Sequence, residues 1–143
     1  MNTGEKTTRP PPVKVLSGQL RTAESQRSAD GRLECVLRPG RARSLPVSMV
    51  WMQGTVLEVQ LHRDTVLLMD ETGTFVVQGI NTIPKGKPCL SPGSYMMVMG
   101  VIRAASPEPV IQAVKMADLS ELTTLHRRMW KLEVEDLQEV LLT

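Results

Sequence analysis

Apolar and polar positions alternate in short, dense runs over the middle of the chain, and this pattern predicts β-strands. β-branched and aliphatic residues dominate these runs, as is typical of strands with one or both faces buried. The five runs span residues 47–61, 65–70, 74–80, 94–104 and 110–116. Polar or Pro/Gly-rich stretches separate them, so we expect a meander of three strands, an irregular connector and then a hairpin.

The first of these runs is unusually long and contains Gly54. A glycine inside a strand favours a bulge or sharp bend, which lets one strand serve two sheets of a small barrel. An all-β fold with a C-terminal helix, a five-stranded OB-fold barrel, is therefore the favoured architecture. An SH3-like barrel is the alternative, and the long first strand favours the OB-fold.

The run from Tyr95 to Ile102 is apolar without interruption, which is more than one buried strand face requires. Alternate side chains of a barrel strand point inward, so either Met96 and Val98 or Tyr95 and Met97 fill the interior. The other set is then expected to form an apolar strip on the outside. Such strips usually mark a protein contact.

The two ends of the chain are expected to differ in structure from the middle. Residues 1–12 are polar and finish in three prolines, so we expect a flexible arm. Residues 13–117 are assigned to the barrel, with a loop-rich insertion near 21–44 that contains one short strand at 33–37. Residues 118–143 are expected to form a helical segment for partner docking.

That C-terminal segment carries apolar residues at spacings of four, three and four: Trp130, Val134, Leu137 and Leu141. These spacings place them on one face of a helix. The helix either packs on its own barrel or binds a partner. Met129, Leu132 and Val140 lie off this face, so the helix is apolar on more than one side, as expected if it does both.

Composition is consistent with one domain of 143 residues, 41% of them hydrophobic. The formal charge is +2, but residues 1–43 carry nine Lys/Arg against four Asp/Glu. Cys35 and Cys89 show no zinc-site or disulfide spacing, which favours an intracellular compartment. We expect neither a secretory signal nor a membrane span.

The sequence offers little for catalysis. His62 and His126 are far apart and are expected on the surface, and Asp70 with Glu71 precedes a polar turn. None of the common nucleotide-binding, hydrolase or metalloprotease motifs occurs. We therefore predict a protein that is not an enzyme and has no metal or cofactor.

An OB barrel also suggests single-stranded nucleic acid as a ligand, and an autonomous single-strand-binding protein is the rival hypothesis. Such sites stack bases on aromatic rings within a basic groove. Two Trp, one Tyr and one Phe are the only aromatic residues of this kind in the chain. Nucleic acid binding is therefore expected to be weak or absent, with the basic residues 1–43 as its main contributor.

Several longer strings resemble a known family. They are PPVKVL (11–16), VWMQG (50–54), PKGKPCLSPGSYMMVMGVI (84–102), SPEP (106–109), QAVKMADLS (112–120) and WKLEVEDL (130–137). Together they make the chain similar to the RecQ-mediated genome instability family, specifically its second, small OB-fold subunit of the Bloom syndrome helicase and topoisomerase III alpha complex. The match is loose over 17–49 and in SELTTLHRRM.

The resemblance implies a nuclear, non-catalytic subunit that pairs with the C-terminal OB domain of the larger RecQ-mediated genome instability subunit. That assembly dissolves double Holliday junctions and helps to dock a peptide of the Fanconi anaemia group M translocase. By residue match, Lys115 corresponds to a lysine needed for assembly with the larger subunit, and Lys14 and Trp130 to residues of the peptide-docking surface. The full set of expected partner-binding residues is Lys14, Lys115, Trp130, Val134, Leu137 and Leu141.

Overall fold

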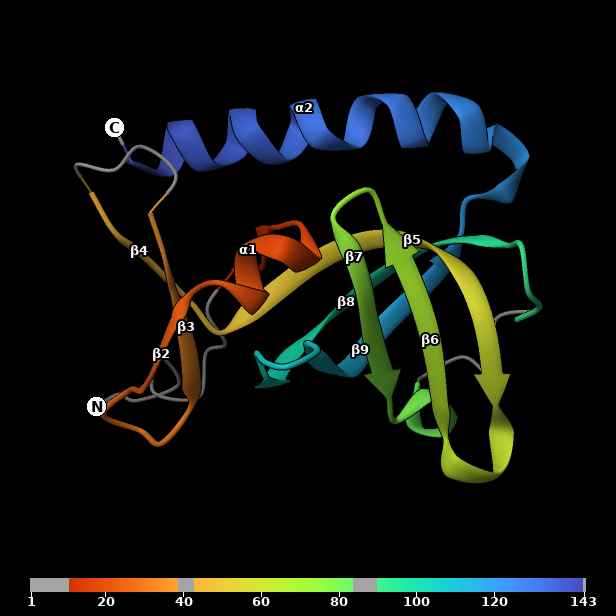
Figure 1. Cartoon of the computed structure of the whole chain (residues 1–143), viewed down its shortest axis with the longest axis horizontal. Helices are drawn as coiled ribbons and strands as arrows, with labels where there is room; N and C mark the ends of the chain where they lie inside the picture. Colours follow the sequence, from red (N-terminus) through yellow and green to blue (C-terminus); the bar gives the residue numbers. More distant parts are fainter. Residues whose placement is uncertain (1–10, 39–42, 84–89, 143) are drawn as a thin grey trace, which may run out of the picture.

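The structure is a computed structural model that describes residues 11–38, 43–83 and 90–142 (Figure 1). The predicted arm therefore falls almost wholly outside the described residues. The strands are β1 (Val13–Lys14), β2 (Glu24–Arg27), β3 (Leu33–Leu37), β4 (Leu45–Val47), β5 (Met49–Gln60), β6 (Thr65–Asp70), β7 (Gly73–Gln78), β8 (Tyr95–Ala104) and β9 (Val110–Asp118). The α-helices are α1 (Ser17–Arg21) and α2 (Thr123–Leu142), and 3-10 turns lie at Leu61–Arg63, Ile80–Thr82 and Ser120–Leu122.

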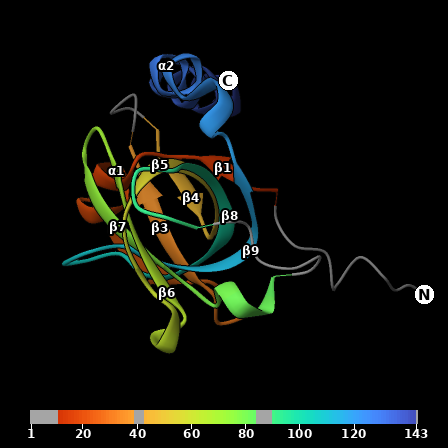
Figure 2. The same ribbon diagram turned by 90° about the vertical axis from the view of Figure 1, so that its right-hand side faces the viewer.

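Five strands close into a ring in the order β5-β6-β7-β9-β8, with β8 pairing back onto β5. All pairs in the ring are antiparallel except β7 with β9, which is parallel. Figure 2 looks into this ring and shows α2 lying outside it. The five strands predicted from the hydrophobic pattern are confirmed.

The long strand β5 joins the two sides of the ring. Its first part, Met49–Thr55, pairs with β8, and its last part, Thr55–Gln60, pairs with β6. As predicted, one strand serves two sides of the barrel, but the register shift lies between Val56 and Glu58 and not at Gly54. Gly54 instead allows a close approach: a Cβ there would lie 2.9 Å from the backbone oxygen of Met69.

Strand β8 directs Met96, Val98 and Ile102 into the ring, where they join the main core. The expected exposed strip on its other side is wrong at two positions, since Tyr95 and Met97 are also buried. Tyr95 is buried because α2 begins above it, and the Arg127 guanidinium lies 5.4 Å from the centre of its ring. The chain therefore covers part of this apolar face itself.

The loop-rich insertion expected near 21–44 contains a strand that was not predicted, β2 (Glu24–Arg27). This stretch supplies β2 and β3, which form a second antiparallel sheet with β4. The expected strand at 33–37 is confirmed as β3, and its Cys35 and Leu37 extend the main core. All four residues of β2 are exposed, so no alternation of buried and exposed side chains marks this strand in the sequence.

Candidate protein-docking site

Helix α2 lies lengthwise over the outside of the ring (Figure 1) and has two different apolar faces. Its inner face buries Trp130, Val134 and Gln138. At 3.6 residues per turn, a second set of apolar side chains falls on the opposite side. We call this set the outer stripe; it consists of Leu125, Met129, Leu132 and Val140, each at least 43% exposed.

The inner face of α2 contacts the barrel through a small cluster that is separate from the main core. Trp130 and Val134 pack there with Leu16, and the half-buried Trp51 of β5 lies against them. Because this cluster is outside the ring, α2 is attached to the barrel as an added layer. We therefore expect that α2 can detach while the barrel stays folded.

Lys14 of β1 sits between the two tryptophans. Its Nζ lies 5.6 Å from the ring centre of Trp51 and 5.8 Å from that of Trp130. The same ammonium forms an ion pair of 3.1 Å with the Oε1 of Glu133 on α2. A cation held over two aromatic faces is a common element of recognition surfaces.

Two side-chain amides, the buried Gln138 and the half-buried Gln19, fix this arrangement. The Nε2 of Gln138 donates to the backbone oxygen of Lys14 at 2.9 Å, and the Nε2 of Gln19 donates to the Oε1 of Gln138, also at 2.9 Å. The backbone N–H of Leu16 donates to the Oε1 of Gln19 at 3.0 Å. These bonds connect α2 to both β1 and α1, and so they fix the position of Lys14 relative to Trp130.

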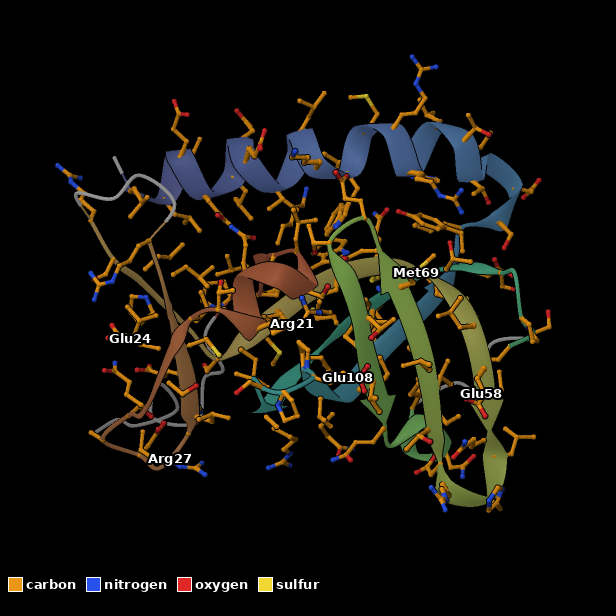
Figure 3. The ribbon with its side chains drawn as sticks, viewed as in Figure 1. Arg21, Glu24, Arg27, Glu58, Met69 and Glu108 are labelled. Atoms are coloured by element: carbon orange, nitrogen blue, oxygen red, sulfur yellow. The ribbon has the colours of Figure 1, made fainter. Side chains whose placement is uncertain are left out.

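A cleft of about 300 Å³ opens beside Trp130, between the start of α2 and the ring. Its lining is mainly apolar and consists of Leu16, Thr55, Met69, Asp70, Glu71, Tyr95, Arg127 and Trp130. Met69, labelled in Figure 3, projects from β6 on this side of the ring and is 43% exposed. A cleft of this size and polarity suits an apolar side chain of a bound segment.

Tyr95 in this cleft supplies a test of the described packing. Burial raises the pKa of its phenol to about 12, while the nearby Arg127 acts in the opposite direction. Tyr95 is the only tyrosine of the chain, so phenolate absorbance in a pH titration reports this residue alone. We expect a midpoint near 12 in the native protein and near ~10 in denaturant.

The sign of the accompanying stability change follows from the same shift. The folded state keeps the proton of Tyr95 to higher pH than the unfolded state does, so folding is opposed as pH rises above the unfolded pKa of ~10. The contribution of Tyr95 to stability is therefore complete below that pH and falls as the pH approaches 12. A native midpoint equal to the denatured one would contradict the burial of this ring.

Three buried polar atoms near α2 lack hydrogen-bond partners among the described residues. They are the indole nitrogens of Trp51 and Trp130 and the Oε1 of Gln53. Unpaired buried groups are rare in native interiors and call for a specific explanation. Their position is consistent with a surface whose hydrogen bonds are completed by water or by a bound segment.

The structure brings together some of the expected partner-binding residues and separates others. Lys14 and Trp130 are neighbours, Leu137 is half-buried and Leu141 is 46% exposed. Val134 is completely covered by packing on its own barrel, and Trp130 is almost as deeply buried; their expected contacts with a partner stay predictions.

Lys115 lies on β9, where it pairs with Met99 of β8. Met99 pairs in turn with Trp51 of β5, and Trp51 pairs with Lys14 of β1. The side chain of Lys115 is exposed, and within the described part of the chain its ammonium has neither a hydrogen bond nor an ion pair. Lys115 is thus available for a partner, two strands away from Trp51 in the sheet.

Sequence reasoning missed several residues of the site, among them Trp51, Arg127 and Gln138. Trp51 was present within a conspicuous string, VWMQG, but its outward direction depends on the strand register. Gln138 follows Val134 by four positions, a spacing that places the two on one helix face. A polar side chain at a buried helical position was the available signal.

The aromatic residues do not form a base-stacking platform. Phe75 is fully buried in the core, and Tyr95 and Trp130 are at most 4% exposed. Trp51 is half-buried beneath Lys14. Since these four are all of the Phe, Trp and Tyr residues in the chain, the rings that single-strand binding needs are covered.

The described ranges show neither a metal-binding cluster nor a membrane-spanning helix. In the described ranges, no three or more His, Cys, Asp or Glu side chains come together in a way that could hold a metal ion. In the same ranges, no helix combines the length and apolar character needed to cross a membrane.

Comparison with known families gives a match over residues 11–138 to the model of RecQ-mediated genome instability protein 2. Relatives with that same name include one from Gallus gallus, 49% identical over 132 residues, which cover 92% of this chain and 94% of the relative. Another, from Mus musculus, is 50% identical over 127 residues, which cover 89% of this chain and 82% of the relative.

Solved structures of similar fold have much lower identity. The Stn1–Ten1 complex of S. pombe gives a TM-score of 0.57 at 8% identity, covering 88% of this chain and 94% of that chain. A replication protein A heterotrimer bound to ssDNA gives 0.55 at 16% identity, covering 87% and 98%. These likenesses establish the fold alone, and they confirm the predicted OB-fold.

Proposed function

The chain belongs to the RecQ-mediated genome instability protein 2 family, and we propose that it is a non-catalytic scaffold subunit. It heterodimerises with the C-terminal OB domain of the larger RecQ-mediated genome instability subunit. In the nucleus, the pair stabilises the Bloom helicase and topoisomerase III alpha assembly that dissolves double Holliday junctions.

The observation that carries the proposal is the outer stripe of α2. Leu125, Met129 and Leu132 place three large apolar side chains in water on a helix that is already anchored by its other face. A helix with one apolar face on its own barrel and another in solvent is suited to dock a helix or groove of a second protein. Methionine in the stripe adapts to an irregular partner surface.

The cleft beside Trp130 supports a second role in the same assembly, the docking of a peptide of the Fanconi anaemia group M translocase. The cleft offers an apolar floor for an aliphatic or aromatic side chain. Lys14 and Glu133, next to it on the other side of Trp130, offer one charge of each sign to the peptide backbone or its polar residues. Anchoring of one apolar side chain with polar contacts around it is a general mode of peptide recognition.

Lys115 supports the contact with the larger subunit. An exposed ammonium that has no partner among the described residues can pair with a carboxylate or backbone carbonyl across an interface. Its neighbours on the outer side of β8 and β9 include the half-buried Met99 and Ala117. The lysine therefore lies on a partly apolar surface.

The test is direct mixing of this chain with the C-terminal OB domain of the larger subunit. We expect size-exclusion chromatography with light scattering to show a one-to-one complex, and Lys115→Ala to reduce its yield. Fluorescence anisotropy with a labelled single-stranded oligonucleotide is the companion measurement. Absence of the complex together with tight, salt-sensitive oligonucleotide binding would refute the proposal in favour of the rival.

A further inference from the structure

Ser44 lies in a sequence that resembles the substrate of arginine-directed protein kinases. In RARSLP, arginines occupy the positions one and three residues before the serine. Kinases of this class recognise such arginines by charge complementarity with acidic residues of their substrate groove. Ser44 is exposed and directly precedes β4, so its hydroxyl is at the surface.

The surroundings of Ser44 are polar and roomy. Ser44 lines a hollow of about 380 Å³ together with Glu24, Ser25, Gln26, Val36, Arg38 and Pro46. Glu24, labelled in Figure 3, forms an exposed ion pair of 2.9 Å with Arg38 across this hollow. In the described part of the chain the Ser44 hydroxyl makes no hydrogen bond, so a phosphate there displaces no existing contact.

Arg43, the residue before Ser44, contacts the C-terminal end of α2. The Nη1 of Arg43 donates to the backbone oxygen of Leu142, the last residue of α2. The final carbonyls of a helix have no partner within the helix and carry its negative dipole end. A guanidinium at this position stabilises the last turn both by hydrogen bonding and by charge.

We propose that Ser44 is a phosphorylation site and that its phosphate withdraws Arg43 from the end of α2. A kinase transfers the γ-phosphoryl group of ATP to the Ser44 oxygen; the new O–P bond replaces the bond to the β-phosphate, ADP leaves, and the hydroxyl proton passes to the kinase base. The phosphate carries a charge of about −1.5 to −2. It attracts Arg43 and repels the negative end of the helix.

The consequence is a looser last turn of α2, which contains Val140 of the outer stripe and the exposed Leu141. Phosphorylation therefore weakens docking of the partner. This step of the inference rests on the proposed function, whereas the modification itself and the loosening of the helix do not.

The test uses the full chain, an arginine-directed kinase and ATP. Mass spectrometry is expected to locate one phosphate on Ser44, and Ser44→Ala to abolish it. Ser28, which follows Arg27 but has no arginine three positions earlier, is the matched control and stays unmodified. Hydrogen exchange of the amides of 139–142 is expected to accelerate about 2- to 5-fold on phosphorylation.

The variant Arg43→Ala separates the loss of the Arg43 contact with Leu142 from other effects of the phosphate charge on Ser44. Without phosphate it reproduces the faster exchange, and with phosphate it shows no further change. An unmodified Ser44, or unchanged exchange in a chain that carries the phosphate, would overturn the inference. Failure of the unmodified chain to bind the larger subunit would instead refute the proposed function, since the exchange measurement needs no partner.

Discussion

Leu132→Glu is expected to weaken the heterodimer strongly while the chain itself stays folded. Leu132 is 58% exposed at the centre of the outer stripe, so its replacement removes no contact within the chain, and glutamate is a good helix former. In the complex the carboxylate would be buried against an apolar partner surface without a counter-charge. We expect a loss of about 3 kcal/mol, roughly 100-fold in Kd, by isothermal titration calorimetry.

The matched control for this variant is Leu57→Glu. Leu57 is also an exposed leucine, 41% exposed, but it lies at the register shift of β5, away from α2. The same change of charge and size there is expected to leave the Kd unchanged. If the Leu132→Glu chain and the unaltered chain bind the larger subunit equally well, the outer stripe is not part of the interface.

Trp130→Ala is expected to detach α2 from the barrel and to leave the barrel folded. Trp130 is the largest buried residue of the small cluster that holds α2, and this cluster is separate from the main core. Truncation of a buried tryptophan costs about 3–5 kcal/mol. We expect loss of helical circular dichroism and fast amide exchange along α2, with slow exchange retained in β5 to β9.

The control for Trp130→Ala is a truncation inside the ring. Phe75 is fully buried in the main core, so Phe75→Ala is expected to destabilise the barrel and α2 together. The Trp130→Ala chain should also bind the larger subunit and the translocase peptide more weakly, because the docking helix is no longer held in place. Cooperative unfolding of the barrel in that chain would show that α2 is an integral part of the core.

The strands of the ring could be predicted because each carries its own signal. Dense β-branched residues and flanking turn sequences mark β6, β7 and β9 without reference to the rest of the molecule. Strand β2 carries no such signal, since ESQR is polar and exposed on both faces. Its pairing depends on β3, and a partner strand is information that a local pattern does not contain.

The site was predictable in its parts but not in its arrangement. The helical spacing from Trp130 to Leu141 correctly indicated a helix with an apolar face, and the off-face residues correctly indicated a second one. What the spacing could not show is which face the barrel covers. That choice depends on Leu16, Trp51 and Gln19, which lie far from α2 in the sequence and are brought next to it only by the fold.

The placement of both tryptophans outside the ring gives the molecule an intrinsic optical reporter. Trp51 and Trp130 are the only indoles in the chain, and both lie beside Lys14, where α2 packs on the barrel. The native tryptophan fluorescence therefore comes entirely from the region where α2 meets the barrel. It does not report directly on the barrel interior. Movement of α2, or arrival of a ligand beside it, can be followed by the intensity and wavelength of that emission without any attached dye.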